Sequence, residues 1–112
     1  MDFYESFRWA EDLFDHRDYR AAARVLRALL AEAEAAPESV GHGLADARLL
    51  LARAYYFSAQ LRRAEETART LLANDPTDAY AALLLAHTLR RGSRHDEADR
   101  AMAVATALGA PA

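Results

Sequence analysis

An internal repeat constrains the fold of this chain more than any other feature. When the sequence is shifted by 34 residues against itself, apolar residues of similar size fall on one another. The matched pairs are Leu51 with Leu85, Ala52 with Ala86, Tyr55 with Leu89, and Ala64 with Ala98. A period of this length indicates one supersecondary unit that recurs along the chain, because each unit buries its apolar face only by stacking on a neighbour.

The first part of the chain matches the same repeat positions when the sequence is shifted by 42 residues instead of 34. The matched pairs there are Trp9 with Leu51, Ala10 with Ala52, Leu13 with Tyr55, and Ala22 with Ala64. The longer shift requires eight additional residues between the first two units. We place this insertion at about 37–43, between units at about 3–36, 44–77 and 78–111 of a single domain.

The residue types favour helices throughout. Alanine, the best helix former, makes up about a quarter of the chain, whereas valine occurs three times and isoleucine is absent. Turn-forming residues interrupt the helical periodicity at intervals. The interruptions predict six helices, at 3–15, 18–36, 44–57, 61–74, 78–91 and 94–108.

Polar residues and glycine at the breaks predict how some helices begin and end. Asp78 can cap helix 78–91 through its side-chain oxygen, and Ser93 can cap helix 94–108. Gly92 is expected to end helix 78–91 in the left-handed conformation that glycine adopts without strain.

The small residues of the repeat predict where paired helices cross. The two columns are Ala10, Ala52 and Ala86 on the first helices, and Ala22, Ala64 and Ala98 on the second helices. We expect the two backbones to approach closely at these alanines. Larger neighbours, among them Trp9, Leu51 and Tyr55, are expected to fill the space around each crossing.

This spacing resembles the tetratricopeptide repeat, a helix–turn–helix unit. The clearest match is the middle unit, which has Leu51-Ala52-x-x-Tyr55 and then Ala64 and Pro76 at the family's intervals. Alanine replaces the family's common glycine in all three first helices, and the first unit lacks the closing proline. The resemblance covers nearly the whole chain and implies an all-α fold, a right-handed α-solenoid of three hairpins without a separate capping helix. A non-repeat helical bundle is the alternative.

The resemblance also implies a function, because the first helices of such solenoids line a concave groove that binds peptides or helices of partner proteins. The first helix of the middle unit carries a second stripe beside the one that packs on its partner, and the register extends this stripe to the other units. The predicted groove residues are Tyr4, Phe7, Glu11, Phe14, Leu49, Arg53, Tyr56, Phe57, Tyr80, Leu83, His87 and Arg90. Most aromatic residues of the chain fall in this stripe, which favours a protein-contact surface over its alternative, ordinary core packing.

The groove positions also indicate what kind of ligand to expect. Some members of the family hold a partner's terminal carboxylate with a lysine and asparagine clamp. The corresponding positions here are Phe7, Glu11, Leu50, Tyr80 and Leu84. We therefore expect an apolar or amphipathic peptide or helix as ligand, and a non-catalytic adaptor or co-chaperone-like role.

The last predicted helix supports a second hypothesis, a structural homo-oligomer. This helix is mostly alanine with Met102, Val104 and Leu108, so its outer face would be weakly apolar and uncovered. A homodimer formed through the terminal helices, with the groove partly filled by the second copy, would cover this face.

Charge and composition argue against most other classes of protein. A net charge of −3 disfavours nucleic acid, although the arginines of 90–95 with Arg62 and Arg63 leave a nucleic-acid-binding regulator as a third hypothesis. The chain has no cysteine, and its four histidines lack the spacing of a helical zinc site, so we expect no metal, cofactor or enzymatic activity. No apolar run is long enough to span a membrane and no signal peptide is evident. The composition, with arginine as the only basic residue, is typical of a bacterial cytoplasmic protein.

Overall fold

The computed structural model describes residues 1–36 and 43–111, and within them the chain is built from helices and short turns. The helices are α1 (Phe3–Asp15), α2 (Tyr19–Ala35), α3 (Leu44–Phe57), α4 (Leu61–Asn74), α5 (Ala79–Arg91) and α6 (His95–Ala107). All six predicted helices are confirmed, with ends that differ by at most one residue because the prediction included flanking cap residues. The predicted insertion lies, apart from Gly43, outside the described residues.

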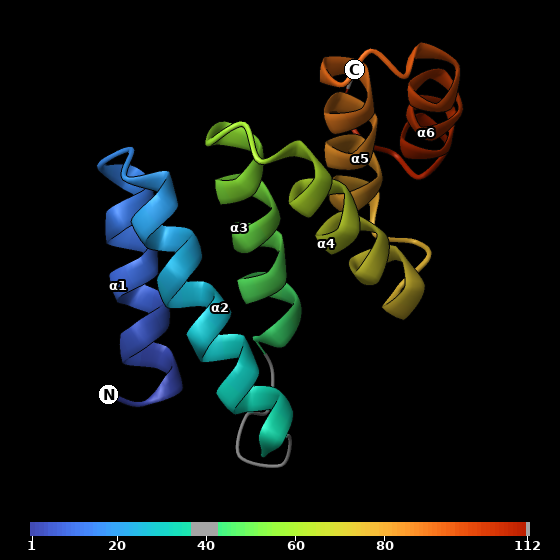
Figure 1. Ribbon diagram of the computed structural model, residues 1–112. Helices are drawn as coiled ribbons and strands as arrows, with labels where there is room; N and C mark the ends of the chain where they lie inside the picture. Colours follow the sequence, from blue (N-terminus) through green and yellow to red (C-terminus); the bar gives the residue numbers. More distant parts are fainter. Residues whose placement is uncertain (37–42, 112) are drawn as a thin grey trace.

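The helices stack in chain order as three antiparallel pairs (Figure 1). Each helix packs against the next one, and the first helices also touch across units, α1 against α3 and α3 against α5. Within the described residues the backbones of the second helices α2, α4 and α6 do not pack against one another. This arrangement is a helical repeat, as predicted, in which the first helices share one face of the molecule.

The alanine columns lie at the centre of the fold. Their members, Ala10, Ala22, Ala52, Ala64, Ala86 and Ala98, are all completely buried. Leucines and a tyrosine surround them, with Leu26 fully buried and Leu51, Tyr55, Leu85 and Leu89 nearly so. The predicted close approach of paired helices is therefore matched by burial in every unit.

Trp9 does not fill a crossing, so that part of the prediction is wrong. Its side chain is 50% exposed, although its repeat equivalents Leu51 and Leu85 are buried. Those leucines lie on the side of α3 and α5 that packs against the preceding helix, α2 or α4. Among the described residues no helix covers that side of α1, so Trp9 remains in contact with solvent.

The turns inside the three pairs repeat as faithfully as the helices. Arg17, Ala59 and Ser93 occupy equivalent positions and all have a left-handed backbone, with φ values of 62°, 61° and 63°. The next residue in each turn donates its backbone N–H to the carbonyl five residues earlier, at 2.8–2.9 Å. This is the 6→1 hydrogen bond of a Schellman motif, so each first helix ends in the same way.

The motif corrects two predictions about the turn between α5 and α6. Gly92 has φ −80° and is not the left-handed residue, because Ser93 occupies that position. Arg94, not Ser93, immediately precedes α6, and no side chain caps that helix. The cap predicted for α5 is confirmed, since the Asp78 carboxylate accepts the backbone N–H of Ala81 at 3.0 Å.

Candidate partner-binding groove

A hollow of about 480 Å³ lies between α3 and α5, on the face that the first helices share. The lining residues are Leu49, Arg53, Tyr80, Leu83, Leu84 and His87. Five of them belong to the predicted groove set, so the structure brings these five together at one place. Leu84, which the sequence also placed at a groove position, completes the lining.

Helical spacing explains why these residues share one face. On α3, Leu49 and Arg53 are four residues apart, and on α5 Tyr80, Leu83 and His87 follow at intervals of three and four. Tyr80 is 64% exposed at the start of α5, so its ring stands at the rim of the hollow.

The loop before α5 holds the start of that helix in place. The Asp75 carboxylate accepts hydrogen bonds from the Thr77 hydroxyl at 2.7 Å and from the Thr77 backbone N–H at 3.0 Å. These bonds lower the pKa of Asp75 below its ordinary value, the hydroxyl contributing most. With the Asp78 cap, they direct the chain from α4 into α5 and so set the position of Tyr80.

An aromatic cluster borders the hollow where α1 and α3 end. Phe14, Tyr19 and Phe57 pack together, with ring centroids 5.0–5.8 Å apart. The guanidinium carbon of Arg53 lies 4.7 Å from the centroid of Phe14, so Arg53 joins this cluster to the hollow through a cation–π contact. The predicted groove residues Phe14 and Phe57 therefore contact each other and leave less aromatic surface for a ligand.

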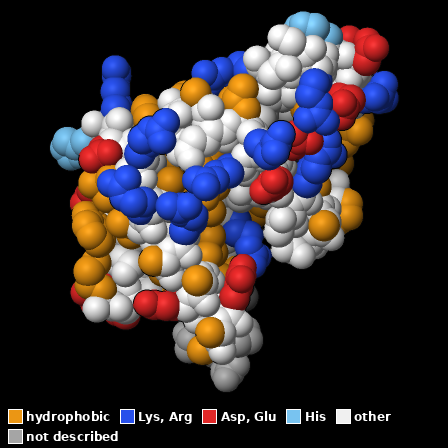
Figure 2. Space-filling model, viewed as in Figure 1, with side chains coloured by type: hydrophobic (Ala, Val, Ile, Leu, Met, Phe, Trp, Pro, Cys, Tyr) orange, Lys and Arg blue, Asp and Glu red, His pale blue; other side chains and the backbone are white. Residues whose placement is uncertain are grey.

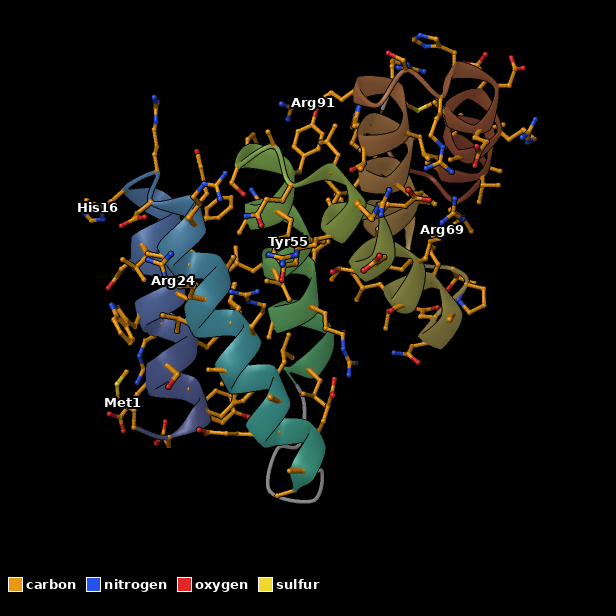
Figure 3. All side chains as sticks on the ribbon, in the orientation of Figure 1. Met1, His16, Arg24, Tyr55, Arg69 and Arg91 are labelled. Carbon is orange, nitrogen blue, oxygen red and sulfur yellow. The ribbon has the colours of Figure 1, made fainter. Side chains whose placement is uncertain are left out.

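Tyr56 is also engaged within the chain. The Arg91 guanidinium lies 4.8 Å from the Tyr56 ring centroid and donates a hydrogen bond to the Tyr56 carbonyl at 2.8 Å. Arg91 comes from α5 and reaches across to the end of α3 (Figure 3). The pair fixes the distance between the two helices that form the hollow.

The groove residues predicted on the first two turns of α1 lie apart from the hollow. Tyr4 is 54% exposed, and Phe7 is half-buried against the core and stacks on Phe3 at 6.2 Å between ring centroids. Glu11 is exposed further along the same helix. None of these three residues lines the hollow.

Arg90 and the neighbouring arginines are tied into ion pairs and hydrogen bonds. Arg90 pairs with Asp99 of α6 at 3.6 Å, and Arg94 forms a two-pronged pair with Glu97 at 2.8 and 3.0 Å. Arg94 also pairs with Glu65 of α4. The basic run at 90–95 therefore carries counter-charges of its own, and this weakens the hypothesis of a nucleic-acid site there.

The pairs around Arg94 connect α4 to α6, two helices whose backbones do not pack against each other. Arg69 adds a bond to Glu65 at 2.9 Å and a longer contact to Glu97 at 3.6 Å. Burial of Glu65 opposes its ionisation, but the hydrogen bonds from Arg94 and Arg69 outweigh that effect and lower its pKa below the ordinary value.

Tyr19 was missed by the sequence reasoning, which assigned groove residues only to first helices. Tyr19 is the first residue of α2, yet its ring stacks on Phe57 at 5.2 Å. An aromatic residue directly after the first turn was the available signal.

In the described part of the chain, no three His, Asp or Glu side chains are grouped so that they could hold a metal ion. No helix there is long and apolar enough to cross a membrane.

Comparison with known proteins agrees with this geometry. The family model for the tetratricopeptide repeat matches residues 13–88. Two solved structures of MamA are similar at 26% identity over 95% of this chain. One is the protein from residue 41 to its end from Desulfovibrio magneticus RS-1, with a TM-score of 0.80, and the other is a double mutant of RS-1 MamA, with a TM-score of 0.79.

The chain spans 55% of the length of either MamA structure. Among curated proteins the comparison found no match. The family model covers well over half of the sequence. The chain belongs to the tetratricopeptide repeat family.

Proposed function

We propose that this chain binds an apolar or amphipathic segment of a partner protein, with one apolar side chain of that segment in the hollow between α3 and α5. Membership in the tetratricopeptide repeat family supports the broader class, a protein–protein interaction module. The observation that carries the finer proposal is the hollow itself, which combines leucines with polar groups at its rim.

The hollow has ample room for a large apolar side chain of the ligand, and its lining suits one. Leu49, Leu83 and Leu84 are each partly exposed and supply an aliphatic floor. Full burial of one leucine or phenylalanine side chain there would contribute roughly 1.5–3 kcal/mol. Arg53 and His87 carry N–H groups at the rim, which can donate hydrogen bonds to the backbone carbonyls of the ligand.

The hollow is also held in shape before a ligand arrives. Arg53 is kept against Phe14, and Arg91 keeps α5 against α3 through Tyr56. A ligand therefore has to order few side chains of the protein, which reduces the entropy lost on binding.

The proposal is tested with peptides selected on the full chain from a random library. We expect the selected peptides to share a large apolar residue, and Tyr80→Ala to weaken their binding by about tenfold in fluorescence anisotropy, the loss of one well-placed aromatic contact. Trp9→Ala is the matched control, because Trp9 is a similarly exposed aromatic outside the hollow. Equal affinity of wild type and Tyr80→Ala would contradict the assignment.

A homo-oligomer is the second candidate function, and one surface favours it. Val104 is 50% exposed on α6 and lines a shallow hollow of about 230 Å³ together with Leu85 and Leu89. Size-exclusion chromatography with light scattering separates the two candidates. A mass that stays monomeric over a hundredfold range of concentration rules out the oligomer.

A further inference from the structure

A basic stripe runs along α2, the second helix of the first unit. Arg20, Arg24 and Arg27 follow one another at i, i+4 and i+7, and all three are exposed. Their spacing puts them on one helical face over a length of about 10 Å. Figure 2 shows basic side chains gathered over this part of the molecule, and Figure 3 labels Arg24 beside α2.

The three arginines of this stripe share one helical face and form no ion pair within the described residues, whereas other arginines without an ion pair there, such as Arg8 and Arg100, lie on different helices. No carboxylate of the described residues pairs with them, and the chain has no acidic residue between Asp18 and Glu32. By contrast, Arg48, Arg69, Arg90 and Arg94 all form ion pairs. The chain carries more acidic than basic residues, 17 against 14, so counter-charges are available and are placed elsewhere.

A cleft of about 450 Å³ lies beside the stripe, between α2 and α4 and over α3. Leu30 and Leu51 form its apolar floor, and Arg27 belongs to both the stripe and the cleft wall. Glu34 lies at one side of the cleft and forms an ion pair with Arg48, with 3.0 Å between the guanidinium nitrogen and the carboxylate oxygen. Glu66 of α4 stands in the opposite wall and has no ion-pair partner among the described residues.

We propose that this α2–α4 cleft is a second docking site, which takes an acidic amphipathic helix of a partner protein. The carboxylates of that helix pair with Arg20, Arg24 and Arg27, and an apolar side chain enters the cleft over Leu30 and Leu51. Glu66 sets the orientation, because it repels carboxylates from α4 and leaves α2 as the side that the acidic face of the ligand can approach.

The chemistry of the cleft favours a protein over a nucleic acid. Its floor is aliphatic, and none of its lining residues is aromatic, so it offers no platform on which bases could stack.

The test uses a designed helical peptide with glutamates at i, i+4 and i+7 and a leucine beside them, labelled for fluorescence anisotropy. A second peptide has lysines in place of the glutamates. We expect the glutamate peptide to bind the full chain and the lysine peptide not to bind. Binding should weaken as salt is raised, because exposed charge pairs are screened.

Arg24→Gln/Arg27→Gln should weaken binding of the glutamate peptide by about tenfold, the loss of two charge pairs. Arg8→Gln/Arg100→Gln removes the same two charges from other faces and should change the affinity less than twofold. Circular dichroism should show unchanged helicity for both variants, because all four side chains are exposed.

Four results would overturn the proposal. The first is no binding of the glutamate peptide at about 1 mM. The second is binding that Arg53→Gln abolishes and Arg24→Gln/Arg27→Gln leaves intact, which would place the peptide in the α3–α5 hollow. The third is a short DNA duplex that binds through Arg24 and Arg27 more tightly than the peptide. The fourth is a dimer in light scattering that Arg24→Gln/Arg27→Gln dissociates, which would make a second copy the occupant.

Discussion

Replacing Ala64 with leucine tests whether the alanine columns set the distance between paired helices. Ala64 is completely buried on α4, and its column partner on the neighbouring helix, Ala52, is completely buried as well. A leucine adds three carbon atoms at a point where two backbones meet, so the helices must separate or the side chain must leave its preferred rotamer. Overpacking of this kind costs about 1–3 kcal/mol.

That cost is a large part of the stability expected for a chain of this size. At about 0.05–0.15 kcal/mol per residue, the free energy of unfolding is roughly 6–17 kcal/mol. A loss of about 2–3 kcal/mol should lower Tm by on the order of 10 °C. Thermal and urea unfolding followed by circular dichroism at 222 nm measure both quantities, and an unchanged urea m-value would show that the variant still unfolds cooperatively.

Ala103→Leu is the matched control, because Ala103 is exposed on α6 and leucine has nearly the same helix propensity as alanine. We expect this variant to unfold within about 0.5 kcal/mol of wild type. If Ala64→Leu also stays within that range, the paired helices do not need a small residue at their crossing, and the alanine columns do not set the helix spacing.

Three further predictions concern a turn, a helix cap and the ion pairs of Glu65. Ser93→Gly should stabilise the chain by up to about 1 kcal/mol in urea unfolding, because Ser93 has φ 63° and glycine adopts this conformation without strain; a loss of stability would contradict the left-handed turn. Asp78→Ala should cost about 1 kcal/mol through loss of the α5 cap, and no change would show that the cap is dispensable. The pKa of Glu65 is lower in the folded chain than its ordinary value of 4.5, so the ionised side chain stabilises the fold at any pH above 4.5. This stabilisation is lost as the pH falls below 4.5 and through the pKa of the folded state. Glu65→Gln should therefore destabilise the chain at neutral pH and differ little from wild type in strong acid, whereas a difference that persists at low pH would mean that packing, not charge, is responsible.

The sequence was sufficient to predict the helices because residues of similar size recur at equivalent positions of each unit. Alanines that recur at 34 residues mark the crossings, and the buried leucines beside them keep the same register, so each unit repeats the pattern of the others. Trp9 shows where this reasoning ends. The register assigned it the same position as Leu51, but burial depends on a neighbouring helix, which is a property of the whole stack.

The candidate site was less predictable for a similar reason. Helical periodicity grouped Leu49, Tyr80 and Leu83, and all three line the hollow. Helical periodicity could not show which side chains would pack against each other within the chain, as Phe14 packs against Phe57. Such contacts depend on rotamers and on the angle between units, neither of which has a signature in a single sequence.

The turn between α5 and α6 illustrates a competition between local preferences and the repeat. Glycine at 92 is the residue best suited to a left-handed conformation, yet Ser93 adopts it. Ser93 lies in the register of Arg17 and Ala59, so the geometry of the hairpin determines which residue is left-handed. Local propensity alone therefore placed the left-handed residue one position too early, although the end of α5 at Arg91 was predicted correctly.

The most direct test of the central claim is an NMR titration of the leucine methyl groups with a library-selected peptide. Binding in the hollow between α3 and α5 predicts that the methyl signals of Leu49, Leu83 and Leu84 shift with a common affinity, while those of Leu30 and Leu51 stay in place. Saturable binding that leaves Leu49, Leu83 and Leu84 unshifted would contradict the proposed function.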